Sequence, residues 1–180
     1  MKTIIKIVLF LFIISNFTIQ AQNQIPNPPY KIYPIQDYAK ILSEKERLLL
    51  NNKLISYYKK TSTEIIVIII HNLHGEDPNI IANEWGQKWK IGKLYKNNGI
   101  VILISIDDKK ISIQNGYGIE PYITDIITGN IIKKVNPYLK NRMYYQTINS
   151  IVNELSKFLK HHFKKKIMFQ KIHGFLVYLS

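Results

Sequence analysis

Two runs of apolar, mostly β-branched residues constrain the fold of this chain more than any other feature. The first lies in Glu64–Ile70, where every residue after Glu64 is apolar, and the second in Ile100–Ile106, where Ser105 is the one polar residue. Runs of this length without polar alternation are typical of strands that are buried on both faces of a sheet. A third segment, Lys110–Gln114, alternates isoleucines with polar residues, which predicts a strand with one more polar face. The turn at Asp107–Lys110 is expected to join the second and third strands as a hairpin.

Four segments with apolar residues at helical spacing surround these strands. Two of them begin with clear start signals: Ser43 and Glu46 form a capping box, and Asp77 is followed by a proline. The predicted helices cover residues 43–60, 77–90, 127–138 and 148–159. Helices that alternate with buried strands predict an α/β fold, a three-layer α/β/α sandwich with a central mixed sheet.

The first residues have the organisation of a secretory signal peptide. Lys2 and Lys6 form a positive region, Ile7–Ile14 an apolar one, and Ala21 ends a plausible cleavage region. We therefore expect an exported protein that is periplasmic or otherwise extracytoplasmic. The alternative is an uncleaved N-terminal segment that keeps it associated with the membrane. The predicted boundaries are a signal peptide at 1–21, a proline-rich linker at 22–34, a folded domain at 35–160 and a basic, degenerate tail at 161–180.

The chain carries a formal net charge of +13 and has no cysteine. A basic balance is compatible with nucleic acid or an anionic membrane surface as a partner. Arginines are not clustered and no nucleic-acid-binding motif is present, so no nucleic acid is expected. The lysines at 164–166 leave an anionic membrane surface as an electrostatic partner.

Acidic residues are scarce, twelve in all, and five of them lie at predicted strand or helix ends near glycine motifs. These five are Asp37, Asp107, Asp108, Glu120 and Asp125. A divalent cation such as Ca²⁺ or Mg²⁺ takes several oxygen ligands from loops, so we expect these carboxylates to converge on one cation pocket. Its expected lining is Asn98, Gly99, Gly116, Tyr117, Gly118 and Thr124. The alternative roles are local: helix caps, turn residues and bonds to nearby backbone.

Catalytic residues stay unassigned at this point. Cysteine is absent, and no Gly-x-Ser-x-Gly elbow is present. His71 and His74 flank a predicted strand end, but without further histidine or cysteine ligands nearby they do not indicate a zinc site.

Several short motifs occur in a characteristic order along the chain. They are Asp37-Tyr38-Ala39, Trp89-Lys90-Ile91-Gly92, Asn98-Gly99, Gly116-Tyr117-Gly118-Ile119-Glu120 and Thr124-Asp125. In order and spacing this set resembles the TPM domain family, which includes a thylakoid-lumen acid phosphatase. The resemblance implies an α/β sandwich in an extracytoplasmic setting, with an acidic pocket that binds a divalent cation in some members. It also implies an accessory, assembly or repair role at a membrane-protein complex or the cell envelope, with a metal-dependent phosphatase acting on phosphomonoesters as the alternative.

The chain departs from the family pattern at three positions. Asn97 stands where the family usually has Asp, Ser112 where a basic residue is common, and Asn130 where Arg is frequent. Losing two cationic positions weakens the binding of a phosphate oxyanion. The departures therefore favour the accessory role over the phosphatase.

Overall fold

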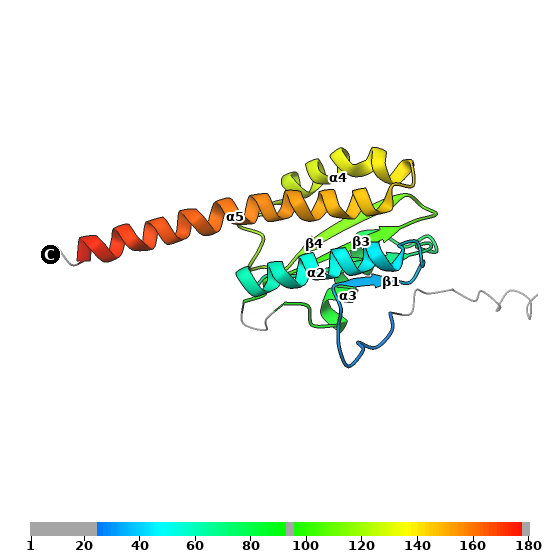
Figure 1. The fold of residues 1–180 in the computed structure, drawn as a ribbon, viewed down its shortest axis with the longest axis horizontal. Helices are drawn as coiled ribbons and strands as arrows, with labels where there is room; N and C mark the ends of the chain where they lie inside the picture. The colour runs from blue at the N-terminus through cyan, green and yellow to red at the C-terminus, as the bar shows by residue number, and fades with distance from the viewer. Residues whose placement is uncertain (1–24, 93–95, 178–180) are drawn as a thin grey trace, which may run out of the picture.

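A four-stranded mixed sheet forms the centre of the molecule in a computed structural model (Figure 1), which describes residues 25–92 and 96–177. The strands are β1 (Ile35–Asp37), β2 (Glu64–Ile70), β3 (Gly99–Ser105) and β4 (Lys110–Asn115), in the order β1-β2-β3-β4. The first three are parallel, and β4 returns antiparallel to β3. The three strands expected from the sequence are confirmed; β1 is a short additional strand at the edge. The expected signal peptide lies outside the described residues.

Burial on both faces explains why β2 after Glu64 and β3 before Ser105 are without polar side chains. Ile66 and Ile68 of β2 belong to one core cluster, and Val67 and Ile69 belong to the other. All seven residues of β3 are buried. Because successive side chains point to opposite faces, a strand covered on both sides has no position at which a polar residue would be solvated.

Helices cover both faces of the sheet, as expected. They are α2 (Glu44–Thr61), α3 (Pro78–Lys88), α4 (Asp125–Lys140) and α5 (Tyr144–Val177). Side chains from α2, α4 and α5 fill the larger core cluster on one face, whereas α3 packs on β3 and β4 from the other face. The predicted three-layer α/β/α sandwich is therefore confirmed.

The last helix is longer than the sequence pattern indicates. Its first part packs against α2 and α4, and its C-terminal part continues away from the sheet as the orange-to-red end of Figure 1. The boundary expected at residues 160/161 falls inside this helix, and the domain limits remain a prediction. Among the described residues, no helix combines the length and apolar content that a bilayer span requires.

The capping box of α2 is formed as predicted, and it provides a test of this start signal. Ser43 Oγ accepts a hydrogen bond from the Glu46 N–H at 3.3 Å, and Glu46 Oε2 accepts one from the Ser43 N–H at 2.9 Å. Ser43→Ala leaves a helical donor unpaired, so we expect a loss of about 0.5–2 kcal/mol in the free energy of unfolding, measured by urea denaturation. Ser56→Ala, on the exposed side of the same helix, is the control and should not destabilise the protein.

Candidate functional site

The sheet topology divides the five predicted acids between two ends of the sheet. Asp37 ends β1 and Asp107 and Asp108 follow β3, so these three lie at the carboxyl end of the parallel strands. Glu120 and Asp125 follow β4, whose end pairs with the beginning of β3. Within the described residues, no group of three or more His, Asp or Glu side chains is placed to hold a metal ion. The prediction that these acids converge is therefore wrong, because the antiparallel return of β4 carries the last two to the opposite end.

The acids at the carboxyl end make local bonds. Asp37 accepts hydrogen bonds from the backbone N–H groups of Ile41 and Leu42, at 3.3 and 2.9 Å, and so closes the turn into α2. Asp108 Oδ2 accepts from the Leu73 N–H at 2.7 Å and from Ser105 Oγ at 2.6 Å. The loop after β2 is thereby fastened to the β3–β4 hairpin. These are the local roles that the sequence left open as the alternative.

The other predicted residues outside the glycine motifs are exposed. Asp107 is exposed in the hairpin turn. Asp125 is exposed in the first turn of α4, and Thr124 occupies the N-cap position of that helix without a side-chain cap bond.

Asp108 should make the stability of the domain depend on pH. The hydrogen bond from Ser105 lowers the pKa of the Asp108 carboxyl below its ordinary value of 3.8, with further help from the Leu73 N–H, Lys110 and His74. Since the folded pKa is the lower one, the ionised group stabilises the fold fully above pH 3.8, and this stabilisation is lost as the pH falls through the folded pKa. Asp108→Asn should therefore lower the melting temperature at pH 6, and the difference from wild type should shrink in scans toward about pH 2.5.

Asp107→Asn is the matched control for this measurement, because its exposed side chain makes no hydrogen bond within the described chain. A pH-independent difference between Asp108→Asn and wild type would contradict the assignment.

The glycine motifs bring two loops into backbone contact at the opposite end of the sheet. A Cβ on Gly118 would lie 1.9 Å from the Lys96 carbonyl oxygen, and one on Gly116 would lie 2.3 Å from that of Asn97. The Gly118 N–H donates to the Asn97 carbonyl at 3.0 Å across the same contact. Asn98 holds the neighbouring turn, because its side-chain amide donates to the Ser62 carbonyl at 2.5 Å. Glycine is needed at positions 116 and 118 because the two backbones approach closely there, as the sequence suggested for Gly116 and Gly118.

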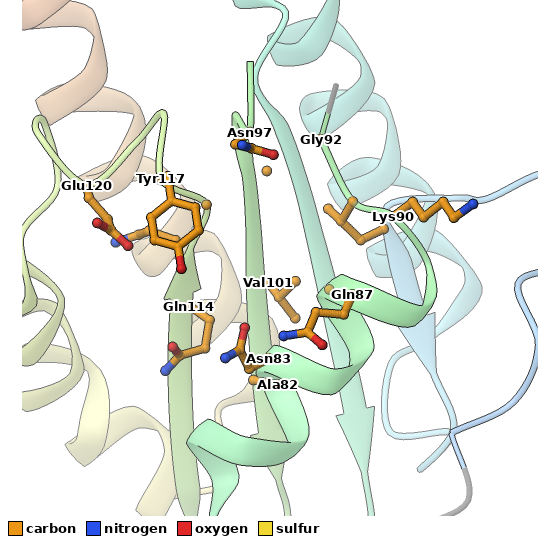
Figure 2. A pocket seen from close by; sticks show the side chains of 15 residues that line it. Ala82, Asn83, Gln87, Lys90, Gly92, Asn97, Val101, Gln114, Tyr117 and Glu120 are labelled. Atoms are coloured by element: carbon orange, nitrogen blue, oxygen red, sulfur yellow. The ribbon is translucent and has the colours of Figure 1, made fainter. Parts of the chain in front are cut away.

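A pocket of about 460 Å³ opens beside this contact, between α3 and the segment that follows β4. We call it the amide pocket (Figure 2); its lining is Ala82, Asn83, Gly86, Gln87, Lys90, Ile91, Gly92, Asn97, Gly99, Val101, Gln114, Asn115, Gly116, Tyr117 and Glu120. Its volume is in the range of small-molecule sites, about 300–1,000 Å³. Small residues on α3 form its floor: a Cβ on Gly86 would lie 3.3 Å from Val101 Cγ2 of β3. The helix can therefore lie close to the sheet while the space beyond it stays open.

Side-chain amides dominate the polar lining. Asn79, Asn83 and Gln87 follow one another at intervals of four residues on α3, so they share one face of the helix. Figure 2 shows the amide groups of Asn83 and Gln87 extending from α3 across β3, toward the side where Gln114 stands on β4. The Gln114 nitrogen donates to Asn79 Oδ1 and to Ser112 Oγ, both at 3.0 Å, and Ser112 Oγ donates to Asn79 Oδ1 at 2.8 Å. This network holds Gln114 in position at the edge of the pocket.

Three further side chains complete the rim. Tyr117 is 78% exposed and lies beside Glu120 on the loop after β4 (Figure 2). Lys90 is exposed, and Figure 2 shows its side chain directed away from the amides. Among the lining residues that the structure describes, Lys90 and Glu120 are the charged ones, and they are opposite in sign. The described lining thus has no net formal charge, on a strongly basic chain.

Sequence reasoning found only part of this lining. Of the predicted residues, Gly99, Gly116, Tyr117 and Glu120 border the pocket. The amides of α3 were missed. Their four-residue spacing was visible in the chain, because each amide residue lies two positions before one of the buried residues Ile81, Trp85 and Trp89.

The sequence matches the family model of the TPM domain over residues 35–158. The chain belongs to the TPM domain family. This confirms the family indicated by the order of the motifs, and it places both the amide pocket and the contact between the glycine loops within the TPM domain. No curated protein matches the chain.

Solved structures agree with the fold. The N-terminal domain of a P. gingivalis protein superposes with a TM-score of 0.67 at 20% identity, covering 72% of this chain and 83% of that one. The N-terminal domain of a Corynebacterium glutamicum protein gives 0.57 at 13% identity, with coverage of 74% and 84%. A protein from the psychrophilic bacterium Bizionia argentinensis gives 0.54 at 19% identity, with coverage of 68% and 86%. At these identities the likeness concerns the fold alone.

Proposed function

We propose that this TPM domain protein is an exported accessory factor that binds a component of the cell envelope, or a membrane-protein complex, through the amide pocket. The observation that carries the proposal is the lining of the pocket. Amides from α3 and β4 face an exposed tyrosine across a preformed hollow. Such a lining supplies hydrogen-bond donors and acceptors for binding, whereas it offers a single carboxylate, Glu120, for proton transfer.

The hydrogen bonds around Ser112 support binding over phosphate-ester hydrolysis. Where a basic residue is common in the family, Ser112 is buried and bonded to Asn79 and Gln114. A phosphoryl group needs cationic partners that neutralise its oxygens. Lys90, the cationic side chain in the described part of the lining, points away from the amides in Figure 2.

Export is the second part of the proposal, and it rests on the charged and apolar regions of residues 1–21. We expect mass spectrometry of the protein isolated from its native host to find the N-terminus at Gln22, in an extracytoplasmic fraction. Recovery of a soluble cytoplasmic protein that still carries Met1 would contradict export.

Site-specific photocrosslinking tests the binding role. A benzophenone amino acid placed at Gln87, in the pocket, should crosslink to a discrete envelope component in intact cells. The same residue placed at Gln146, exposed at the start of α5, is the control and should not. Equal crosslinking from the two positions would contradict a pocket-directed partner.

A phosphatase assay on the purified protein addresses the competing function. With p-nitrophenyl phosphate and either Ca²⁺ or Mg²⁺, we expect wild type and Glu120→Gln to release product at the same background rate. Divalent-cation-dependent turnover that is lost in Glu120→Gln would instead favour the phosphatase.

A further inference from the structure

We infer that the amide pocket binds a neutral, polyhydroxylated ligand, a saccharide unit of the envelope; this inference rests on the proposed function. The argument starts from charge. The formal net charge of the chain is +13, yet the described lining of the pocket holds one cationic and one anionic side chain, Lys90 and Glu120. A site for a phosphate or a carboxylate would gather cations, and a site for a hard divalent cation would gather several carboxylates. The lining does neither, so its chemistry selects an uncharged polar ligand.

The amides define the kind of polar group that is recognised. An Asn or Gln side chain offers an acceptor oxygen and a donor nitrogen side by side. Adjacent sugar hydroxyls present the same pairing, since each hydroxyl both donates and accepts. The side chains of Asn83 and Gln87 make no hydrogen bond within the described chain, and both lie over β3 on the pocket side of α3 (Figure 2). They are therefore available to a ligand.

Gln114 adds a third amide whose orientation is already set. Its nitrogen is engaged by Asn79 and Ser112, so the carbonyl oxygen is the group left to accept from a ligand hydroxyl. A polar group held in place before binding loses less rotamer freedom when the ligand arrives. Ser112 is thus a positioning residue: its hydrogen bonds to Asn79 and Gln114 fix the Gln114 amide that would contact the ligand.

Tyr117 supplies the apolar part of a saccharide site. A pyranose ring has a face of C–H groups that packs against aromatic rings, while its edge carries the hydroxyls. Tyr117 offers a ring that is 78% exposed, and the glycines on both sides of it hold its backbone close to Lys96 and Asn97. An aromatic ring with a polar tip suits a ligand that is apolar on one face and wet at its edge. The pocket volume of about 460 Å³ fits a mono- or disaccharide.

Ligand-observed NMR on the full-length protein tests the inference with four named probes. These are N,N′-diacetylchitobiose, maltose, inorganic phosphate and triglycine. We expect at least one of the two disaccharides to bind, with a dissociation constant that is roughly millimolar, since a few hydrogen bonds and one ring contact are made. Because the ligand is neutral, raising NaCl from about 50 to 500 mM should change the affinity by less than about twofold.

Variants locate the binding. Gln87→Leu and Tyr117→Ala should each weaken it by about three- to tenfold, the loss of one hydrogen bond or one ring contact. The matched controls Gln146→Leu and Tyr30→Ala carry the same changes at exposed positions outside the pocket and should bind as wild type does. All four positions are exposed, so melting temperatures should stay near that of wild type and a loss of binding can be assigned to the site.

The outcomes separate the inference from the proposed function. If phosphate or triglycine binds and Gln87→Leu removes it while neither disaccharide binds, the saccharide inference is overturned and a pocket-directed binding role stands. If disaccharide binding is insensitive to both pocket variants, the inference is overturned as well. If no probe binds and crosslinking from Gln87 equals that from Gln146, both the inference and the proposed function fail.

Discussion

Gly118→Ala is expected to lower the free energy of unfolding by an amount at or above the upper end of the usual 1–3 kcal/mol for overpacking. The new Cβ would lie 1.9 Å from the Lys96 carbonyl oxygen and 3.1 Å from that of Asn97. Both are backbone atoms, so the clash can be relieved only by separating the two loops. That movement would also break the bond from the Gly118 N–H to the Asn97 carbonyl. Urea denaturation followed by circular dichroism measures the loss.

Gly129→Ala is the matched control for this experiment. Gly129 lies inside α4, and a Cβ there would have no heavy atom within 4 Å. Alanine is the better helix former, so this variant should gain about 0.5–1 kcal/mol. If Gly118→Ala unfolded at the same urea concentration as wild type, the contact between the two loops would not exist as described. The wall of the amide pocket, which depends on that contact, would then be wrong as well.

Trp85→Ala is expected to cost about 3–5 kcal/mol, the range for removing a large aromatic side chain from a core. Trp85 is 3% exposed, and its ring lies 4.9 Å from that of Trp89 and 5.5 Å from that of Tyr38, between centroids. Trp85 and Trp89 both belong to the smaller core cluster, which lies between α3 and the sheet. The cavity left by alanine would weaken the docking of α3, which carries the amides of the pocket. Urea denaturation followed by circular dichroism again gives the loss, without depending on the tryptophan signal.

Ile80→Ala is the comparison on the same helix, because Ile80 is 57% exposed. Removing its exposed side chain should change the stability by no more than about 0.5 kcal/mol. A small loss for Trp85→Ala, comparable with that for Ile80→Ala, would contradict the packing of α3 on the sheet. A large loss would also be accompanied by weaker ligand binding, since the amides depend on the position of α3.

The burial of the tryptophans also shows how far periodicity alone reaches. Trp85 and Trp89 fall on one helical stripe with Ile81, and the stripe is buried. The start of α2 at its capping box and the apolar runs of β2 and β3 are likewise evident from the order of the residues. Each of these features depends on residues a few positions apart, or on whether a strand is covered on both faces. Local spacing and composition therefore determined the elements and the three-layer class.

The site depended on information that local spacing does not contain. Asp37 ends a strand and Asp108 and Glu120 follow strands, and the sequence alone suggested that their carboxylates meet. The antiparallel pairing of β4 with β3 sends Glu120 to the opposite end, and that pairing sense is a long-range property. The docking of α3 over β3 and β4 then brought the amides of Asn83 and Gln87 to Tyr117. The sequence by itself determined the three longer strands, the positions of the four helices and the family, whereas the short edge strand β1 and the full length of α5 came from the structure. Only the tertiary structure decided which side chains share a pocket, because strand direction and helix docking join residues that are distant along the chain.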